Sequence, residues 1–352
     1  MSLEEQRIKI DAIDTDIIRL LNERADIVHE IGVIKKREGL EIYAPEREEK
    51  LLRSLVVKGE GGRLPEESIR AIYREIMSAA LALEEDLKIA YLGPAGTWTH
   101  QAAIGKFGHS VKYLPQPSFG DVFDQVERRI ADYGVVPIEN STEGAVTHTL
   151  DLFADSPLKI YGQVMMPIEN NLMANCPREE IRHIYSHPQI IAQCRGWLSR
   201  NFREIQPVEK SSSAAAAEFA AKEPGSAVLG GALLAELYGL LTLETSIQDI
   251  ANNTTRFLVI SQKTCPPTGK DRTSVMFSVR DEPGSLHRAL EPFEKLAINM
   301  SKIESRPSKR RAWEYYFFVD IAGHCEDPEL ADVIKQLEKH CSFVKVLGSY
   351  PA

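Results

Sequence analysis

The stretch Lys88-Ile89-Ala90-Tyr91-Leu92-Gly93-Pro94-Ala95-Gly96 marks the point where this chain changes from one residue pattern to another. Its first five residues predict a short strand, the Gly-Pro and Ala-Gly pairs predict a turn, and a helix is expected from Thr99. Strands and helices are then expected to alternate, with strands at Tyr133–Ile138, Lys159–Met165, Ala227–Leu229 and Arg256–Ser261 and helices at Phe119–Ala131 and Ser213–Lys222. This alternation predicts open, mostly parallel sheets. Crossings near Pro167 and Thr242 would divide them into two lobes.

The residues before this stretch predict helices almost throughout. From Leu3 to Arg37, apolar residues recur every three or four positions, as on one face of a helix, and Gly39 follows as a stop. Two shorter helices are expected to begin after Pro45 and Pro65. One very long helix and two short ones cannot bury their apolar stripes alone, so the pattern predicts an all-α helical dimer for residues 1–86.

The residues after the α/β segment predict a third domain. The proline-rich run Cys265–Gly269 is expected to be a linker. Beyond it the expected elements have the order βαββαβ, at Thr273–Val279, Ser285–Leu296, Asn299–Arg306, Ala312–Ile321, Pro328–Lys339 and Val344–Tyr350. That order is typical of a ferredoxin-like sandwich. We therefore expect a multidomain chain divided at 1–86, 87–264 and 270–352, which suits a length of 352 residues.

Composition and charge exclude several classes of protein. A formal net charge of −9 disfavours nucleic acid as a partner, and the basic run Lys309-Arg310-Arg311 is expected to be a solvated loop. The chain has no apolar run long enough for a bilayer and begins without a signal-peptide pattern. Its five cysteines form no CxxC pair, which indicates reduced thiols and argues against a zinc site. We expect a cytoplasmic protein without a membrane partner, metal or cofactor.

Basic residues of the long helix suggest a site for an anion. Arg24 and Lys35 are eleven residues apart, which is about 20° of rotation and roughly 16 Å of rise on a helix. Their side chains can therefore converge on one ligand. Arg7 lies roughly 25 Å from Arg24 along the same helix, so it can serve such a site only in a partner subunit. A charged coiled-coil dimeriser would explain the same spacing without catalysis.

The set Arg7…Leu20-Leu21-Asn22-Glu23-Arg24…Ile34-Lys35…Pro45-Glu46-Arg47-Glu48…Glu84 resembles the all-helical chorismate mutases over the whole segment. The resemblance implies an intertwined dimer with two sites, each completed by an arginine from the opposite long helix. It implies that the partner subunit's Arg7 would hold carboxylates of chorismate together with Arg24 and Arg47. Lys35 would then reach the ether oxygen and Glu48 the ring hydroxyl. A Claisen rearrangement suits such a site, because it needs a clamped conformer and positive groups at the oxygen that gains charge.

Two positions depart from the pattern of that family. Ala44 stands where Asp is usual, which removes a helix cap, and Glu84 stands where Gln is common. An ionised Glu84 would oppose the developing negative charge, so we expect burial to raise its pKa and catalysis to use the protonated acid. These departures keep open an inactive, purely structural helical segment.

Polar clusters in the middle segment lie where expected strands meet expected helices. The clusters are Gly93–Thr97, Pro137–Gly144, His187–Gln189, Ser211–Ala214 and Asn252–Phe257. Open α/β sheets bind ligands at such junctions, and hydroxyl groups beside helix N-termini suit carboxylates. The first cluster lacks the third glycine of a dinucleotide-binding fingerprint. Each cluster alone is better explained as a cap or turn, but five together favour a site.

In this order the clusters resemble prephenate dehydratase across about Lys88 to Gln262, with Thr255-Arg256-Phe257 as the most specific signal. The resemblance implies a two-lobed, periplasmic-binding-protein-like fold with prephenate in the cleft. Thr255 would supply the proton for the departing hydroxyl, Arg256 would anchor a carboxylate, and Phe257 would give apolar surroundings. The other residues expected to line the cleft are Thr97, Glu139, Asn140, Ser141, Gln189, Ser212 and Ser213.

Two short motifs in the last segment resemble the phenylalanine-binding signatures of ACT-type regulatory domains. They are Pro283-Gly284-Ser285-Leu286, and Asn299 with Glu304-Ser305-Arg306-Pro307. A glycine turn at a helix start lets backbone N–H groups approach a carboxylate. The resemblance implies L-phenylalanine as an effector held by Gly284, Ser285, Leu286, Asn299, Glu304, Ser305 and Arg306. Ser285-Leu286-His287 departs from the commoner Ala-Leu-Val, which leaves the affinity open.

Taken together, the resemblances imply a homodimer or larger homo-oligomer that converts chorismate to prephenate and prephenate to phenylpyruvate in L-phenylalanine biosynthesis, with feedback inhibition by phenylalanine. A first alternative is a dehydratase with an inactive helical segment. A second is a two-lobed, non-catalytic protein that senses an amino acid, although it leaves Thr255-Arg256-Phe257 and the Arg24, Lys35 and Arg47 set unexplained.

Overall fold

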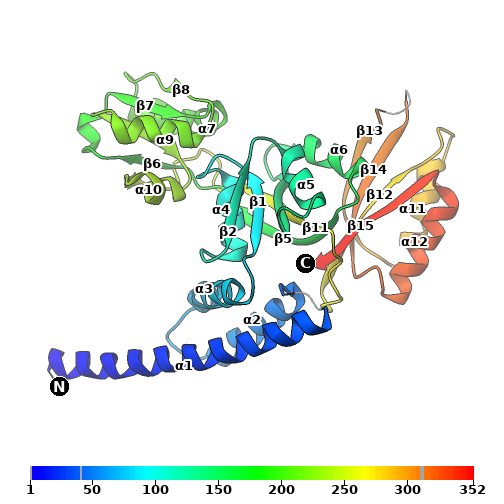
Figure 1. Cartoon of the computed structure of the whole chain (residues 1–352). Helices are drawn as coiled ribbons and strands as arrows, with labels where there is room; N and C mark the ends of the chain where they lie inside the picture. Colours follow the sequence, from blue (N-terminus) through cyan, green and yellow to red (C-terminus); the bar gives the residue numbers. More distant parts are fainter. Residues whose placement is uncertain (1, 40–41, 310–312) are drawn as a thin grey trace. The chain divides into compact units, whose positions relative to one another are not determined.

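The computed structural model describes residues 2–39, 42–309 and 313–352 (Figure 1). Their packing separates two compact units. The first holds the residues up to Leu87 together with Phe107–Lys112, and the second holds Lys88–Lys106 together with Tyr113–Ala352. Every helix in the described ranges is too short or too polar to span a bilayer. No group of His, Cys, Asp or Glu in the same ranges could hold a metal ion.

The first unit is built from three helices, α1 (Leu3–Glu38), α2 (Pro45–Gly59) and α3 (Glu66–Glu84). Ser2 and Glu5 form a capping box at the start of α1, and Gly39 ends it in the left-handed region with φ of 67°. Pro45 begins α2, where Ala44 offers no capping side chain. The helical N-terminal segment predicted from the sequence is confirmed.

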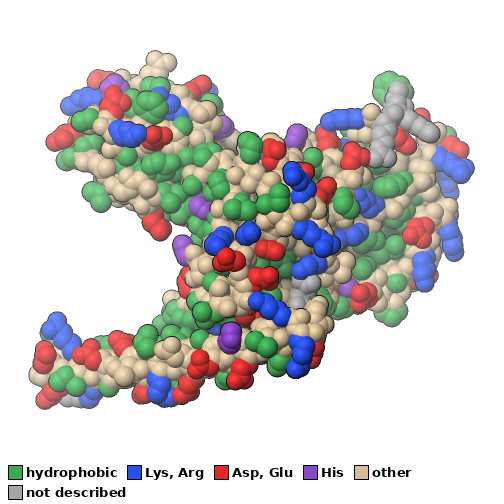
Figure 2. Space-filling view, in the orientation of Figure 1, with side chains coloured by type: hydrophobic (Ala, Val, Ile, Leu, Met, Phe, Trp, Pro, Cys, Tyr) green, Lys and Arg blue, Asp and Glu red, His purple; other side chains and the backbone are tan. Residues whose placement is uncertain are grey.

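Most apolar side chains of α1 are not buried within the chain. Only Val28 and Gly32 of its described residues are buried. Figure 2 shows charged side chains of both signs and apolar side chains mixed along the visible face of this helix. The large apolar side chains that α1 exposes are Leu3, Ile8, Ile10, Ile13, Ile17, Ile18, Leu20, Ile27, Ile31, Val33 and Ile34.

The second unit begins with a lobe built on one sheet of strand order β2-β1-β3-β11-β5, to which β4 adds beside β3. Its strands are β1 (Lys88–Leu92), β2 (Lys112–Gln116), β3 (Tyr133–Asn140), β4 (Gly144–Ala145), β5 (Lys159–Pro167) and β11 (Thr254–Ser261). Its helices are α4 (Trp98–Phe107), α5 (Phe119–Glu127) and α6 (Thr147–Asp155).

A second lobe is built on a sheet of strand order β10-β6-β9-β7-β8. Its strands are β6 (Asn171–Ala174), β7 (His183–Ser186), β8 (Val208–Glu209), β9 (Ser226–Gly230) and β10 (Leu241–Glu244). Its helices are the 3-10 turn η1 (Arg178–Glu180), α7 (Pro188–Gln193), α8 (Arg195–Asn201), α9 (Ser213–Lys222) and α10 (Leu233–Tyr238).

Both sheets are mixed, so the expectation of mostly parallel sheets was wrong. β1 runs parallel to β3, and β7 runs parallel to β8 and β9. In contrast, β11 is antiparallel to both β3 and β5, and β6 is antiparallel to β9 and β10. In the first lobe, the reason is the path of the chain. The chain leaves this lobe along β5 and re-enters it along β11, so β11 runs in the opposite direction to β5.

The return crossing between the lobes also differs from the prediction. Thr242 pairs with Met173 inside the second sheet, so the chain does not cross there. It crosses after β10, where the amide of Ile168 donates to the carbonyl of Asn253 at 2.8 Å. The outgoing and returning segments therefore lie side by side, directly before Thr255.

The C-terminal segment has the expected βαββαβ order. The elements are β12 (Asp271–Ser278), α11 (Ser285–Lys295), β13 (Met300–Pro307), β14 (Tyr315–Ala322), α12 (Pro328–His340) and β15 (Phe343–Pro351). They form an antiparallel sheet of order β13-β14-β12-β15. The predicted start of the third strand at Ala312 lies outside the described residues. Helices α11 and α12 cover one face, where Phe293 and Leu337 pack with Phe277.

The other face of this sheet packs against the first lobe. Met276, Phe318 and Leu347 share one apolar core with Ile138 and Leu258 of the first lobe. The run Cys265–Gly269, predicted as a linker, therefore joins two parts that share a core, and Cys265 itself is buried. The C-terminal sheet thus packs against the face of the first-lobe sheet on which Ile138 and Leu258 lie.

Gly348 of β15 is a sensitive test of this packing. A Cβ added there would overlap the carbonyl oxygen of Ile160 in β5 and lie 2.8 Å from its amide nitrogen. We expect Gly348→Ala to lower the free energy of unfolding by about 1–3 kcal/mol, because backbone atoms cannot move aside as a flexible side chain can. Thermal unfolding followed by circular dichroism measures the change.

Gly105→Ala is the matched control, since an added Cβ there meets open space on α4. That variant should melt at or slightly above the wild-type temperature, because alanine favours a helix over glycine. Equal melting temperatures for the two variants would show that β15 is not pressed against β5.

Candidate functional site

Charged side chains of the first unit gather where α1 meets the end of α3. The Glu84 side chain is only 7% exposed, and its Oε2 atom lies 3.5 Å from Lys35 Nζ. Lys35 also donates to the carbonyl of Ile42 at 2.7 Å, and Lys36 donates to the carbonyl of Glu84 at 2.8 Å. The last turn of α3 is therefore held against α1 by two lysines.

Gly32 makes this close approach possible. A Cβ added to Gly32 would lie 3.1 Å from Glu84 Cγ and 3.5 Å from Glu84 Oε2. A larger residue at position 32 would therefore press on the carboxyl group. Glycine suits this position of the helix because the Glu84 side chain occupies the space that a larger residue would need.

The environment of Glu84 raises the pKa of its carboxyl group. Burial raises the pKa, and Lys35, Lys36 and Arg24 lower it by less, so the net direction is upward. This is the direction expected from the sequence. The structure thus brings Lys35 and Glu84 together, and the charge of Arg24 also acts on the carboxyl group.

The other residues predicted for this cluster are less enclosed. Arg47 is exposed in the first turn of α2, next to the half-buried Glu48. Arg7 is exposed and lies 3.7 Å from Glu4. Since Arg7 and Arg24 are separated by roughly 25 Å of helix, Arg7 cannot reach Glu84 of its own chain.

A second cluster surrounds Thr255 at the start of β11. Thr255 is buried, and its Oγ1 atom accepts a hydrogen bond from Asn140 Nδ2 at 2.8 Å. The same nitrogen donates to Asn253 Oδ1 at 2.6 Å. Since Asn140 is the donor, the hydroxyl hydrogen of Thr255 is left to be donated elsewhere.

The orientation of the Asn140 amide is fixed by its own loop. Its Oδ1 atom accepts from the amide of Thr142 at 2.9 Å, from the Thr142 hydroxyl at 2.6 Å and from the amide of Glu143 at 3.0 Å. A flipped amide would turn NH₂ toward these N–H donors. The nitrogen must therefore face Thr255.

Ser141 ties this loop to the returning chain. Its backbone N–H donates to the carbonyl of Thr254 at 2.9 Å, and the Thr254 N–H donates to Ser141 Oγ at 2.9 Å. Ser141 Oγ also donates to the carbonyl of Asn252 at 3.2 Å. Asn140 therefore contacts Thr255 directly, while Ser141 holds the residues just before Thr255 in place.

Glu143 joins the same loop to the second lobe. Its carboxylate accepts from Gln189 Nε2 and, at 3.0 Å, from Gln193 Nε2, both on α7. Gln189 is therefore brought to the Asn140 loop. Asn170 Nδ2, on the outgoing crossing, donates to Gln193 Oε1 at 3.1 Å. This set of amides and one carboxylate links the two lobes beside Thr255.

Thr97 and Ser212 already serve as helix caps. Thr97 Oγ1 donates to the carbonyl of Leu92 at 2.7 Å and accepts from the amide of His100 at 3.2 Å. Ser212 Oγ accepts from the amide of Ala215 at 3.0 Å, and Ser213 begins α9. A ligand at these places would meet the N–H groups of the first helical turn rather than these hydroxyls.

The two capped helices approach each other through Gly231 of the second lobe. A Cβ added to Gly231 would lie 2.8 Å from the Trp98 ring and 2.7 Å from Gln101 Oε1, both on α4. The preceding Gly230 lies close to Ser213: a Cβ there would be 3.6 Å from Ser213 Cβ. The start of α4 and the start of α9 are therefore neighbours across the lobes.

Arg256 and Glu139 turn away from Thr255, which corrects their predicted placement in the cleft. Successive side chains of a strand point to opposite faces. Arg256 therefore faces the C-terminal sheet, where its Nη2 atom donates to Asp320 Oδ2 at 2.6 Å. Its Nε atom lies 2.8 Å from Glu139 Oε1 without the alignment of a hydrogen bond. The buried Phe257 is again on the Thr255 face by the same alternation.

Burial alone lowers the pKa of Arg256, but Tyr350, Asp320 and Glu139 raise it by more. The guanidinium therefore keeps its charge although its side chain is only 3% exposed. It cannot act as a proton donor at any ordinary pH.

The residues predicted to hold an effector are divided among several places. Gly284, Ser285 and Leu286 line a pocket together with Trp313, Tyr315 and Phe317. Asn299 lines a second pocket with His287, Leu290, Glu291 and Met300. Glu304 and Ser305 lie on β13. Arg306 is on the same strand, but its side chain pairs with a residue of α6 in the first lobe.

Arg306 pairs with Asp151 of α6 through both carboxylate oxygens, at 3.1–3.2 Å. Lys309, whose side chain is 68% exposed, donates to the same carboxylate at 2.7 Å; Arg310 and Arg311 lie outside the described residues. Burial raises the pKa of Asp151, but the hydrogen bonds and charges of Arg306 and Lys309 hold it below its usual value.

Sequence reasoning missed several residues of these clusters. Glu143 and Asn253 lie inside the quoted polar runs, and their place beside Asn140 and Thr255 is a signal that could have found them. Gln193 is four residues after Gln189, the spacing of one helix face, which is a second usable signal. Asp151 and Asp320 carry no local signal, because their partners are distant in the chain.

Comparison with known proteins matches three successive segments of the chain to three family models. The family model described as chorismate mutase type II matches residues 6–85, that of prephenate dehydratase matches 89–265, and that of the ACT domain matches 273–339. A bifunctional chorismate mutase/prephenate dehydratase of Aquifex aeolicus is 48% identical over 354 residues, covering 99% of this chain and 98% of that protein.

Two solved structures share the fold of about three quarters of the chain. A prephenate dehydratase of Arthrobacter aurescens in complex with L-Phe is 33% identical, with a TM-score of 0.69, over 76% of this chain and 90% of that one. GqqA, described as a quorum quenching acylase, is 29% identical with a TM-score of 0.69, over 75% of this chain and 98% of that one.

Proposed function

The chain belongs to the bifunctional chorismate mutase/prephenate dehydratase family, and on that premise we propose how its segments divide the work. Residues 1–86 rearrange chorismate to prephenate, and residues 87–264 convert prephenate to phenylpyruvate in the cytoplasm. Residues 270–352 bind L-phenylalanine and lower the activity. The observation that supports the dehydratase assignment best is the Thr255 hydroxyl, which Asn140 holds with its hydrogen free to be donated.

For the mutase reaction, the helical cluster supplies positive charge and one neutral acid. We assign the substrate carboxylates to Arg24, Arg47 and the partner subunit's Arg7, and the ring hydroxyl to Glu48. Lys35 and a protonated Glu84 both donate to the ether oxygen as the C–O bond breaks and charge gathers on it. The 7% exposure of Glu84 supports this assignment, because hydrogen bonds to developing charge are strongest where water is excluded.

The borrowed arginine requires a second copy of the chain, and α1 offers the surface for it. Its 36 residues make a helix about 54 Å long, whose apolar side chains are largely exposed in the single chain. Packing this apolar stripe against the same stripe of a second chain would remove the exposed side chains of both helices from water. We therefore propose a homodimer through α1 as the smallest active form of the mutase.

The raised pKa of Glu84 leads to a pH-dependence. If the neutral acid is the active form, mutase activity is highest below the pKa of Glu84 in the folded protein and falls as pH rises through it. Glu84→Gln should flatten that fall, since an amide donates a hydrogen bond at every pH. Initial rates of chorismate loss at saturating substrate, measured from acid to alkaline pH, provide the test.

Glu85→Gln is the control for this experiment, because Glu85 is the exposed neighbour at the end of α3. Its profile should match that of the wild type. A decline with pH that persists unchanged in Glu84→Gln would remove Glu84 from the mechanism.

For the dehydratase reaction, we propose that Thr255 donates a proton to the departing ring hydroxyl. The bond from the ring to its carboxylate breaks and releases carbon dioxide. The bonding electrons move into the ring, and the C–O bond breaks with loss of water. Solvent then restores the proton of Thr255. The first turns of α4 and α9 offer N–H groups for the substrate carboxylates, and Phe257 adds apolar surroundings.

Removing the Thr255 hydroxyl should separate the two reactions. Thr255→Ala should lower phenylpyruvate formation by at least about a hundredfold, the usual effect of losing a positioned acid. Conversion of chorismate to prephenate should continue, so prephenate should accumulate. Following chorismate, prephenate and phenylpyruvate separately in one reaction measures both activities.

Thr255→Ser is the matched control, since it keeps the hydroxyl and should retain most of the phenylpyruvate rate. An alanine variant that consumes prephenate as fast as the wild type would refute the role of Thr255. The same assay tests the alternative of an inactive helical segment, which predicts that chorismate is not consumed at all.

We propose that L-phenylalanine binds where Gly284, Ser285 and Leu286 begin α11, with Asn299, Glu304 and Ser305 contributing from β13 and the residue before it. Calorimetry on the full-length protein should detect binding of L-phenylalanine, and the ligand should slow phenylpyruvate formation. Asn299→Ala should weaken binding about tenfold, as expected for one lost hydrogen bond to a charged group. Lys335→Ala, an exposed position on α12 outside both pockets, should bind as the wild type. Absence of binding heat with the wild type would exclude this proposal.

A further inference from the structure

On each of two neighbouring strands of the first lobe, a site residue and a charged residue are adjacent in sequence and point to opposite faces. Thr255 pairs in register with Asn140, and Arg256 pairs in register with Glu139. Asn140 and Thr255 meet on one face through their hydrogen bond. Glu139 and Arg256 meet on the other face, toward the C-terminal sheet. Any movement of the charged pair along the strands must therefore also move the pair in the site.

The register of β3 is adjusted at this place. The partner of Arg256 is Glu139, but the partner of Phe257 is Pro137, so Ile138 is an extra residue in β3. Such a bulge changes the direction of neighbouring side chains. Ile138 lines the pocket between the two sheets, and Glu139 reaches Arg256 beside it. The bulge thus lets two successive residues face the C-terminal domain.

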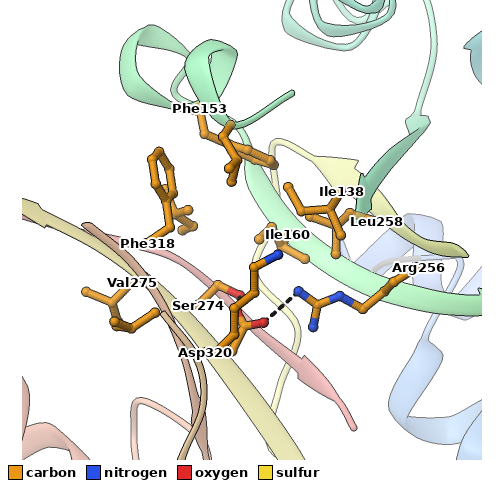
Figure 3. A pocket seen from close by; sticks show the side chains of 13 residues that line it. Ile138, Phe153, Ile160, Arg256, Leu258, Ser274, Val275, Phe318 and Asp320 are labelled. Carbon is orange, nitrogen blue, oxygen red and sulfur yellow. Dashed lines mark hydrogen bonds and ion pairs between the residues drawn. The ribbon is translucent and has the colours of Figure 1, made fainter. Parts of the chain in front are cut away.

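Four charged side chains form a group between the two sheets, in which Arg256 and Asp320 are buried and Glu139 is 33% exposed. Arg256 pairs with Asp320 of β14 at 2.6 Å, and both side chains are nearly inaccessible, with 3% and 6% exposure. Lys302 of β13 pairs with Glu139 at 2.5 Å. Formal charges cancel within the group. Figure 3 shows Arg256 and Asp320 reaching toward each other from opposite sheets.

Polar side chains hold Asp320 from its own domain. Ser274 of β12 donates to Asp320 Oδ1 at 2.5 Å, and the Ser274 hydroxyl lies 2.7 Å from the hydroxyl of Tyr350. Apolar side chains surround the group, including Phe153, Leu258 and Phe318. The pocket between the sheets measures only about 20 Å³, room for about one water. Asp320 is therefore a fixed anchor rather than a mobile partner.

A buried ion pair is poor evidence for stability, because desolvation offsets much of the attraction. An apolar contact would fill the same space at less cost. What the ion pair adds is direction: a guanidinium accepts its carboxylate in few geometries, so it fixes the position of the strand that carries it. That strand begins with Thr255.

We propose that Arg256 and Asp320 are positioning residues for the dehydratase reaction. Their pair holds β11 against the C-terminal sheet and so keeps the Thr255 hydroxyl in place against Asn140. The C-terminal domain is then a working part of the dehydratase, in addition to its role as a sensor. This inference rests on the function proposed above for Thr255. It assigns to Arg256 a role at the interface, in place of contact with the substrate.

Asp320→Asn gives the sharpest test. The substitution keeps the size of the side chain and its bond from Ser274 but removes the charge. Arg256 still has Glu139 as a charged neighbour, so the fold should survive. We expect kcat for prephenate to fall about tenfold or more, since small misplacements of a reacting group are costly. KM should change by less than about twofold, because the substrate itself does not touch this pair.

Asp151→Asn is the matched control. It breaks a second ion pair between the lobe and the C-terminal domain, that of Arg306 with Asp151 at 3.1 Å. Asp151 is on α6 rather than on a strand that carries a site residue. Its kcat for prephenate should stay within about twofold of the wild type. Chorismate consumption should be unchanged in both variants, which shows that the rest of the chain is intact.

A double variant keeps the inference testable if Asp320→Asn does not fold. Arg256→Met with Asp320→Leu replaces the pair by apolar side chains, an exchange that buried ion pairs often tolerate without loss of stability. Full dehydratase kcat in a folded double variant, or in Asp320→Asn, would overturn the proposal. So would an equal loss in Asp151→Asn, since the effect would then be general loosening. A wild-type chain inactive on prephenate would instead sink the proposed function itself.

Discussion

The structure depends on the rule that successive side chains of a strand point to opposite faces. β3 and β11 lie between a polar cluster on one side and the C-terminal sheet on the other, and they contribute side chains to both. Thr255 and Asn140 face the cluster, whereas Arg256 and Glu139 face the C-terminal sheet. The residues next in sequence to the proposed acid are therefore structural partners of another domain. Adjacent residues of one motif have separate tasks because the backbone separates them.

Glu84 and Arg256 are both buried ionisable groups, and the cost of burying their charge is reduced in different ways. Removing an ionised group from water is costly unless it is paired or neutralised. Glu84 has cationic neighbours, yet burial outweighs them and raises the pKa of its carboxyl group. Arg256 cannot lose its proton, so it must be paired, and Asp320 and Glu139 supply the charges. A buried carboxyl group can thus respond to its surroundings through its pKa, whereas a guanidinium keeps its charge and must be paired.

Much of the local structure could be predicted from the sequence, because it depends on neighbours in the chain. The stop at Gly39, the start at Pro45 and the strand Lys88–Leu92 all follow from short-range chemistry. The polar runs around Asn140 and Thr255 were recognised for a similar reason. Sheet direction and the partners of Arg256 were not predictable in this way. The Arg256–Asp320 bond joins positions 64 residues apart, and no periodicity reports on such a contact. The motif placed Arg256 beside Thr255 in sequence, and only the pleat of the strand places it on the other face.

The shared core also limits how a ligand on the C-terminal domain can act on the first lobe. A ligand shifts an equilibrium only by the difference in its affinity for two arrangements. Here β13 carries Lys302, which pairs with Glu139, and Arg306, which pairs with Asp151, so one strand touches the lobe at two points. Apolar packing and charged pairs around β12 and β14 resist gradual sliding, because close-packed interfaces change between discrete arrangements rather than deform continuously. A ligand that favoured a different position of β13 would therefore have to break or exchange these ion pairs. The cost of doing so sets the smallest difference in affinity that could regulate the enzyme.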